Sequence, residues 1–174
     1  MTKIYAIGDS YVAGYGVRPG SSWVDTLEQK LQMPIVNLGI NGGWITELQE
    51  ERIPLEEGDY LLVLGGCNDL LGDRSAKDVE RAYEHFRETA RQSKARVLIL
   101  LPPMPSITSD DLFVGMAMIE SLKNKLLELY EISEGFSLEN IIQGDDARFI
   151  DGIHLDEKGH ELIADAVFKE ISNL

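Results

Sequence analysis

Short apolar segments alternate with longer segments of helical period along the whole chain. Four apolar segments have the length of strands, and a weaker fifth candidate follows them: 3–7, 34–38, 60–64, 96–101 and a stretch within 136–142. Parallel strands need a crossover connection, usually a helix, so this alternation is typical of βαβ units. We therefore predict an α/β fold of three α/β/α layers, built on a mostly parallel, five-stranded sheet.

The segments between the strands carry helix signals. Ser22 and Asp25 form a Ser-x-x-acid capping box, and the apolar spacing that follows predicts a helix that runs to about Gln32. Three further helices are expected around 79–90, at 118–130 and after a cap at Asp156. Because no Gly/Ser linker or low-complexity segment interrupts this order, we expect one domain over residues 1–174.

The charge of the chain limits its partners. With 30 acidic against 16 basic residues, the formal net charge is −14, and a phosphate backbone would need clustered Lys and Arg. We therefore expect a small-molecule partner and no nucleic acid. Cys67 is the only cysteine, so no intrachain disulfide can form. With no apolar run of the length of a signal peptide core or a membrane span, we expect a cytoplasmic protein without stable membrane insertion.

Small polar residues and glycines follow three of the predicted strands: 8–10, 39–43 and 65–69. Ligands of open α/β sheets bind at the carboxyl ends of the strands, so these three loops are expected to converge on one site. Backbone N–H groups together with the Asn68 amide suit an anion or an oxyanion. The chain has neither a GxxxxGK[ST] motif nor a GxGxxG motif after a strand, which argues against a nucleotide site.

One of the three histidines is a candidate general base. His85 lies opposite the apolar face of its helix and is expected in solvent, and His160 shares the apolar stripe of the last helix and is expected to pack. His154 instead lies in a loop, three residues after Asp151. At this separation a turn can bring the carboxylate to Nδ1 of the imidazole, fix its tautomer and stabilise its charged form.

The candidate nucleophile is Ser10, at the end of the first strand. A serine hydroxyl is a weak nucleophile at neutral pH and needs a base within hydrogen-bond reach. Since Ser10 and His154 lie far apart in the chain, only the fold can join them. We predict that Ser10 Oγ lies within hydrogen-bond reach of His154 Nε2.

The sequence resembles the SGNH, or GDSL-type, hydrolases in four blocks that occur in the family's order: Gly8-Asp9-Ser10, Gly42, Gly66-Cys67-Asn68-Asp69 and Asp151-Gly152-Ile153-His154. The resemblance implies a flavodoxin-like sheet and a serine esterase with an acyl-enzyme intermediate. It implies that Ser10 is the nucleophile, His154 the base and Asp151 the residue that orients His154. The oxyanion hole would comprise the N–H groups of Ser10 and Gly42 and the amide of Asn68. No metal or cofactor is implied, and Asp9 is expected only to bond loop backbone.

The substrate remains open at this point. An acyl esterase or lysophospholipase-like acylhydrolase, a carbohydrate O-acetyl esterase and a thioesterase all fit the same triad. We expect the acyl pocket to involve Tyr11, Trp44, Leu70 and Leu71, and Met104 within 102–113. The segment 107–118 is compatible with a lid, a dimer contact or part of the core, and no feature of the sequence indicates an oligomeric state.

Two alternatives come from other classes of protein. A metal-dependent phosphoesterase would use Asp9, Asn68, Asp69 and His154 as ligands. A non-catalytic flavodoxin-like domain would hold a flavin or another small ligand in the glycine loops.

Overall fold

A computed structural model of the chain describes residues 2–108 and 110–172. Its five strands form one sheet in the order β2-β1-β3-β4-β5, and all four neighbouring pairs are parallel. The strands are β1 (Ile4–Gly8), β2 (Ile35–Gly39), β3 (Tyr60–Leu64), β4 (Arg96–Leu101) and β5 (Phe136–Ser137). The predicted α/β class and five-stranded sheet are confirmed.

The last strand is shorter than the range within which we expected it. Of the segment 136–142, only Phe136 and Ser137 pair with β4, and the chain then forms the short helix α7 (Glu139–Ile142). The apolar residues Leu138 and Ile142 are buried four positions apart, on one face of a helix. A short apolar run does not distinguish a strand from a buried helix, which is why the sequence left this element open.

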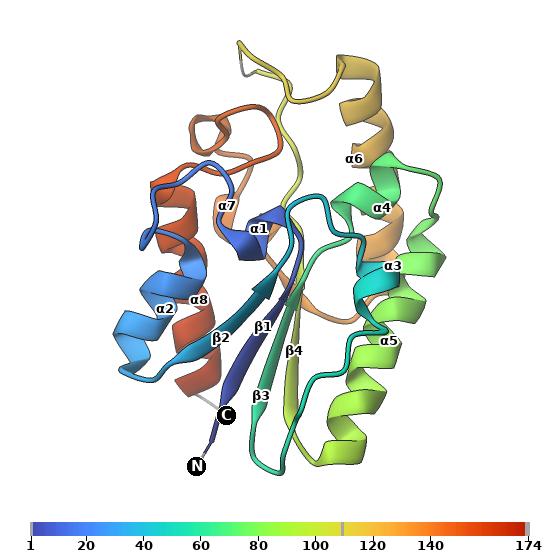
Figure 1. Ribbon diagram of the computed structural model, residues 1–174. Coiled ribbons are helices and arrows are strands. Elements are labelled where there is room, and N and C mark those ends of the chain that lie inside the picture. Colours follow the sequence, from blue (N-terminus) through green and yellow to red (C-terminus); the bar gives the residue numbers. More distant parts are fainter. Residues whose placement is uncertain (1, 109, 173–174) are drawn as a thin grey trace.

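Helices cover both faces of the sheet (Figure 1). One layer contains α2 (Trp23–Leu31) and α8 (Glu157–Ser172), which pack against each other. The other contains α5 (Ala76–Ser93) and α6 (Met116–Ile132), also in contact. The three predicted layers are therefore present, and the capping box of Ser22 and Asp25 begins α2 as expected.

Three short helices stand at the strand ends where the sequence indicated only loops. They are α1 (Ser10–Ala13) after β1, α3 (Ile45–Leu48) after β2 and its loop, and α4 (Cys67–Leu71) after β3. Each is a single turn, too short to show a helical period in the sequence. All three lie at the upper end of the sheet in Figure 1, which is the carboxyl edge of the parallel strands.

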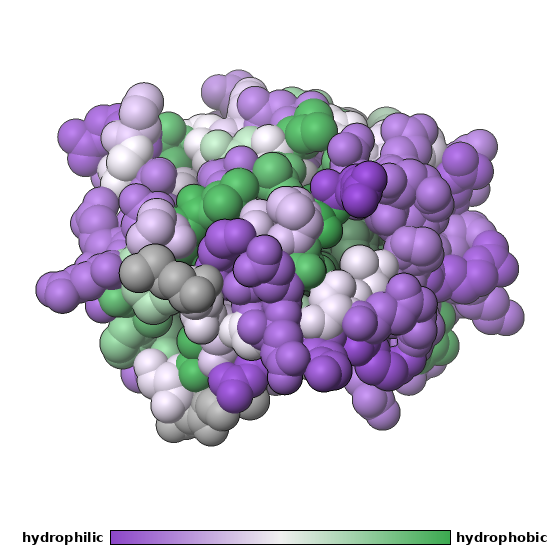
Figure 2. All heavy atoms as spheres, turned by 60° about the horizontal axis from the view of Figure 1, so that its bottom comes forward, coloured by the Kyte–Doolittle hydropathy of each residue, from purple (hydrophilic) through white to green (hydrophobic). Residues whose placement is uncertain are grey.

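The face of the molecule shown in Figure 2 is mostly hydrophilic. In the face shown in Figure 2, hydrophilic side chains cover most of the outline and hydrophobic side chains gather in a band between them. No helix within residues 2–108 and 110–172 is long and apolar enough to cross a membrane.

His160 joins the two helices of one layer from within the core. Its side chain is 1% exposed, and its Nδ1 accepts a hydrogen bond from the backbone N–H of Trp23 at 3.0 Å. Burial of the imidazole, with help from the nearby His154, lowers the pKa of His160 to about 4, although Asp156 and Asp25 act in the opposite direction. The prediction that His160 is a packing residue is confirmed, and His85 is exposed as expected.

Replacing His160 should therefore change how stability depends on pH. Between about pH 6.5 and pH 4 the unfolded chain binds a proton at this histidine and the native chain does not, so wild-type stability falls as the pH falls through this window. In His160→Gln that contribution disappears, which amounts to a difference on the order of 3 kcal/mol at the acidic end. Urea unfolding at pH 4 to 7 measures it, with the exposed His85→Gln as the control. Parallel pH profiles for wild type and His160→Gln would contradict this account.

Candidate active site

The end of β1 is too crowded for any residue except glycine at position 8. A Cβ atom on Gly8 would lie 1.7 Å from the carbonyl oxygen of Leu64 in β3. The chain then turns at Asp9, whose Oδ1 accepts a hydrogen bond from the backbone N–H of Tyr11 at 3.0 Å and caps α1. The expectation that Asp9 bonds loop backbone is confirmed. Ser10 is thereby fixed as the first residue of α1, at the carboxyl edge of the sheet.

The structure brings Ser10 and His154 together across 144 positions of sequence, with Ser10 Oγ 3.0 Å from His154 Nε2. The predicted contact is confirmed. On its other side, His154 Nδ1 lies 2.6 Å from Asp151 Oδ2. The three side chains thus form a continuous hydrogen-bonded chain, and both Ser10 and His154 are buried. This is the arrangement in which an imidazole can accept a proton from a hydroxyl while a carboxylate stabilises the resulting charge.

Asp151 is held in place by backbone N–H groups of its own loop, which also contains His154. Its Oδ1 accepts hydrogen bonds from the backbone N–H groups of Ile153 at 3.0 Å and His154 at 2.7 Å. Burial on its own would raise the pKa of Asp151, but these bonds and the one from the imidazole outweigh it and hold the pKa below its usual range. The carboxylate is therefore ionised at neutral pH.

Tyr11 supports this loop from below instead of lining a substrate pocket. Its side chain is 2% exposed, and its hydroxyl donates a hydrogen bond to the carbonyl oxygen of Ile153 at 2.5 Å. Leu70, another residue that we expected in the substrate pocket, is 1% exposed in the core. Neither side chain offers a surface to a ligand, and we correct both assignments to packing. The sequence gives no signal that separates a core position from a pocket wall, because an aromatic residue or a leucine suits both.

The segment between β4 and α6 is attached at two points to the loop that contains Asp151 and His154. The N–H of Ser106 donates to the carbonyl oxygen of Gly152, and the N–H of Phe113 donates to that of Asp151, each at 2.8 Å. The Phe113 ring packs edge-on against the His154 imidazole, with 4.9 Å between the ring centroids. Within 107–118, the part around Phe113 is thus joined to the site itself.

Two residues predicted for the oxyanion hole follow β2 and β3, the strands on either side of β1. Gly42 follows β2 with a φ of +74°, a left-handed conformation that favours glycine. The Asn68 amide donates from Nδ2 to the carbonyl oxygen of Gly43 at 3.0 Å. An Asn amide carries two N–H donors, so one remains for a ligand. Asn68 therefore lies against the loop that contains Gly42, as convergence of the strand ends requires.

Asp69 is a positioning residue that sequence reasoning considered only as a metal ligand. It is fully buried, and its carboxylate accepts hydrogen bonds from the N–H of Ile45 at 2.8 Å, the N–H of Thr46 at 3.1 Å and the hydroxyl of Thr46 at 2.6 Å. Two N–H groups at the start of α3 are thereby satisfied. Asn68 and Asp69, adjacent in the chain, together fix the loop between β2 and α3.

The metal-binding alternative gains no support from the described residues. Among residues 2–108 and 110–172, no group of three or more His, Cys, Asp or Glu side chains is arranged to hold a metal ion. The carboxylate oxygens of Asp69 already accept three hydrogen bonds, and those of Asp151 accept bonds from the His154 loop.

Two other residues predicted for the substrate pocket keep partly accessible positions. Trp44 is half-buried beside Gly72, and the Arg74 guanidinium lies 5.5 Å from the centre of its ring. Met104 is also half-buried, and its backbone N–H donates to Glu139 at 2.8 Å. A role in substrate binding stays a prediction for both.

Comparison with known proteins identifies relatives of the whole chain. The model of the GDSL-like lipase/acylhydrolase family matches residues 6–162. The structure is similar to that of a member of the lipolytic protein G-D-S-L family from Veillonella parvula DSM 2008, with a TM-score of 0.80 and 18% identity over 100% of both chains. No protein with a curated description matches the sequence.

Two other similar structures belong to enzymes with different named activities. A carbohydrate acetylesterase family member from Sinorhizobium meliloti has a TM-score of 0.71 and 17% identity, over 98% of this chain and 97% of that one. The psychrotrophic esterase EstA from Pseudoalteromonas sp. has a TM-score of 0.64 and 20% identity, over 99% of this chain and 98% of that one. At such identities the likeness establishes the fold and leaves the substrate open.

Asp9 makes the stability of this site dependent on pH. Burial, with the nearby Asp69 adding to it, raises the pKa of Asp9 to about 7, although the N–H of Tyr11 and the nearby His154 pull it down. Between about pH 4 and pH 7 the native chain keeps a proton that the unfolded chain loses, so this group lowers stability as the pH rises. Asp9→Asn should therefore gain stability over wild type from pH 4 to pH 7, by a few kcal/mol.

Urea unfolding across this range measures the gain, with Asp73→Asn, at an exposed carboxylate, as the matched control. An Asp9→Asn variant whose stability relative to wild type is the same at both ends of the range would contradict a protonated Asp9.

Proposed function

Because the chain belongs to the GDSL-like lipase/acylhydrolase family, we propose that it is a serine hydrolase that cleaves a carboxylic ester of a small molecule. The observation that carries the proposal is the hydrogen-bonded chain from Ser10 Oγ through His154 to Asp151, with distances of 3.0 Å and 2.6 Å. A nucleophile, a base and an orienting carboxylate are the groups that acyl transfer needs.

In the first half of the reaction, Ser10 attacks the ester. The hydroxyl oxygen forms a bond to the carbonyl carbon while its proton passes to Nε2 of His154. The imidazole becomes positively charged, and the ionised Asp151 stabilises that charge through Nδ1. The carbonyl oxygen takes up the displaced electron pair and becomes the oxyanion of a tetrahedral intermediate.

The oxyanion is assigned to three donors at neighbouring strand ends. Ser10 is the first residue of α1, so its backbone N–H has no acceptor within the helix and is free to donate to the substrate. Gly42 would supply a second backbone N–H, and the free N–H of the Asn68 amide a third. Asn68 and Asp69 support this assignment, since their bonds to Gly43, Ile45 and Thr46 preorganise the Gly42 loop before substrate arrives.

The intermediate then collapses to an acyl-enzyme. The bond to the alcohol oxygen breaks, His154 returns its proton to that oxygen, and the alcohol leaves with Ser10 acylated. In the second half, His154 removes a proton from water, the resulting hydroxide attacks the acyl carbon, and Ser10 recovers its proton as the carboxylic acid departs.

The acyl group and the alcohol define the finer class of substrate. Acyl esterase or lysophospholipase-like activity is our first proposal, and carbohydrate O-acetyl esterase or thioesterase activity on the same triad is the alternative. Trp44 and Met104 are the half-buried candidates for the acyl wall. A series of p-nitrophenyl esters of increasing chain length, run beside acetylated sugars, lysophospholipid and an acyl thioester, separates these classes.

Removing either end of the Ser10–His154 pair should abolish turnover. Ser10→Ala lacks the nucleophile and His154→Ala lacks the base, so we expect kcat to fall by at least about 10²- to 10⁴-fold for p-nitrophenyl acetate. Stoichiometric labelling of Ser10 by an organophosphonate, read by mass spectrometry, should be lost in Ser10→Ala.

The exposed His85→Gln serves as a control for these variants and should keep wild-type turnover. Exhaustive chelation should leave the activity intact, in contrast to a metal-dependent phosphoesterase. Near-normal hydrolysis by Ser10→Ala or His154→Ala, with circular dichroism showing an intact fold, would refute the mechanism.

Asn68 offers a test of the oxyanion hole that leaves the triad in place. Asn68→Ala removes an amide donor, so we expect kcat to fall by about 10²- to 10³-fold because this donor acts on charge that develops in the transition state. Steady-state kinetics should show a smaller change in KM than in kcat. A variant that loses affinity while keeping kcat would assign Asn68 to ground-state binding instead.

A further inference from the structure

Two exposed aromatic rings cover the imidazole of His154 on its outer side. The centroid of the Tyr15 ring lies 4.3 Å from that of His154, and the centroid of the Phe113 ring lies 4.9 Å from it. The two aromatic rings contact each other edge-on at 6.3 Å. Tyr15 is 42% exposed and Phe113 is 53% exposed, whereas His154 between them is buried. We call Tyr15 and Phe113 the aromatic pair.

The backbone N–H of each residue of the aromatic pair donates a hydrogen bond to a residue of the triad. The N–H of Tyr15 donates to the carbonyl oxygen of Ser10 at 3.0 Å, and the N–H of Phe113 donates to that of Asp151 at 2.8 Å. Because both rings are exposed, packing alone does not account for their position beside the triad. The backbone of both residues is thereby held next to the triad.

The aromatic pair lies on the side of the site where the alcohol part of the ester is expected. In the proposed reaction, Nε2 of His154 must reach the alcohol oxygen to return its proton, so the alcohol part lies next to the imidazole. The exposed aromatic side chains in contact with that imidazole are Tyr15 and Phe113, whereas the nearby Tyr11 is buried. The aromatic pair is therefore the candidate surface for the alcohol part.

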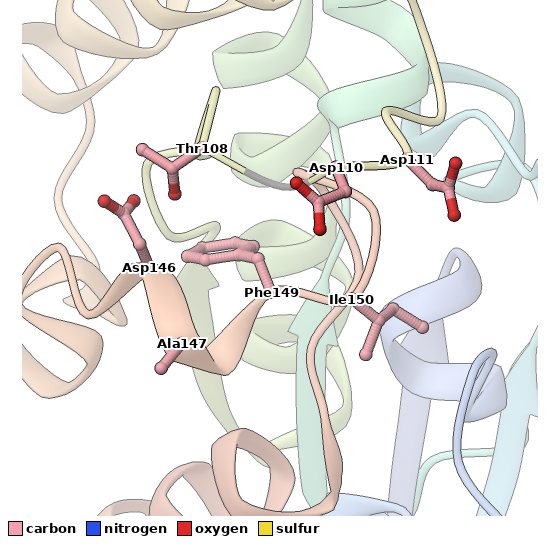
Figure 3. A pocket seen from close by; sticks show the side chains of 7 residues that line it. All are labelled: Thr108, Asp110, Asp111, Asp146, Ala147, Phe149 and Ile150. Carbon is pink, nitrogen blue, oxygen red and sulfur yellow. The ribbon is translucent and has the colours of Figure 1, made fainter.

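The surroundings of the pair are acidic. A cavity of about 470 Å³ is lined by residues of the loop that contains Phe113, among them Asp110 and Asp111, and by residues of the segment 146–150, among them Asp146. Figure 3 shows the Phe149 ring between the carboxylates of Asp146 and Asp110 in this view. Ile150 connects the cavity to the aromatic pair, because its side chain packs over Gly16, next to Tyr15. The carboxylates of this cavity repel an anionic group.

From this geometry we propose that Tyr15 and Phe113 form the binding surface for the alcohol part of the ester, and that this surface selects flat, apolar alcohols without negative charge. The inference rests on the proposed function and names the substrate class of that same site. Aromatic rings gain contact energy with flat apolar groups in offset or edge-to-face arrangements. The acidic side chains disfavour alcohols with a net negative charge, such as those that carry a carboxylate.

Three acetate esters test the inference in the wild-type protein. Methyl acetate has an alcohol too small to cover the rings, benzyl acetate adds a flat apolar group, and 4-(acetoxymethyl)benzoate adds a carboxylate to it while keeping the same leaving atom. We expect kcat/KM for benzyl acetate to exceed that for methyl acetate. At low salt it should also exceed that for the carboxylate ester about five-fold, and this gap between benzyl acetate and its carboxylate derivative should shrink as salt is added.

Variants then locate the preference. The double variant Tyr15→Ala/Phe113→Ala should lower the ratio of kcat/KM for benzyl acetate to that for methyl acetate roughly ten-fold, since each ring contributes about two- to ten-fold. The conservative Tyr15→Phe and Phe113→Tyr should keep the ratio. Asp110→Asn/Asp111→Asn should narrow the gap between benzyl acetate and its carboxylate derivative. Leu127→Ala, at an exposed apolar side chain on α6, is the control.

The possible outcomes distinguish failure of the alcohol-binding inference from failure of the proposed ester hydrolysis. If Tyr15→Ala/Phe113→Ala loses both esters in equal proportion, the rings only support His154 and the inference is wrong. An active wild type that shows no preference among the three esters also overturns it, whether or not the variants fold. A wild type that hydrolyses no ester and is not labelled at Ser10 by an organophosphonate would overturn the proposed function, and the inference with it.

Discussion

The packing of β1 between β2 and β3 is the constraint on which the rest of the site depends. Gly8 has no room for a Cβ because the carbonyl oxygen of Leu64 stands against it. This close approach fixes where β1 ends, and the cap at Asp9 then fixes Ser10 as the first residue of α1. Since the neighbouring strands are parallel and in register, their own ends place Gly42 and Asn68 at the same edge.

The other half of the site is a loop held from several sides. Asp151 bonds the N–H groups of its own loop, and the Tyr11 hydroxyl bonds the carbonyl oxygen of Ile153 from within the core. The segment between β4 and α6 adds bonds from Ser106 and Phe113. A histidine in a loop would otherwise sample many orientations, and catalysis by a general base requires one. The number of backbone bonds to this short loop accounts for that precision.

The site also contains groups that lower stability. Asp9 is buried with its Oδ2 lacking a hydrogen-bond partner among the described residues, and Asp69 lies close enough to raise its pKa further. Buried polar groups without partners are uncommon in native proteins and concentrate where function requires them. Here the unfavourable burial accompanies the sharp turn that presents Ser10, while the carboxylate of Asp69 is fully used in fixing α3.

The sequence alone determined the α/β class, four of the strands to within one residue at either end, and the identity of Ser10, His154 and Asp151 as candidates. These features depend on local periodicity and on which residue types can perform the chemistry, and both are visible in a linear sequence. The fifth strand lies inside the range 136–142 within which it was expected, but only the structure gave its bounds, because a short apolar run suits a strand and a buried helix equally.

Only the tertiary structure decided which side chains face the reacting atoms. Tyr11 and Leu70 are apolar residues near the motifs and were reasonable candidates for a pocket, yet both point into the core. Tyr15 and Phe113 have no sequence signal that connects them, since they meet at His154 from loops almost a hundred positions apart. Exposure and side-chain direction in loops depend on contacts between distant segments, and no local pattern encodes those contacts.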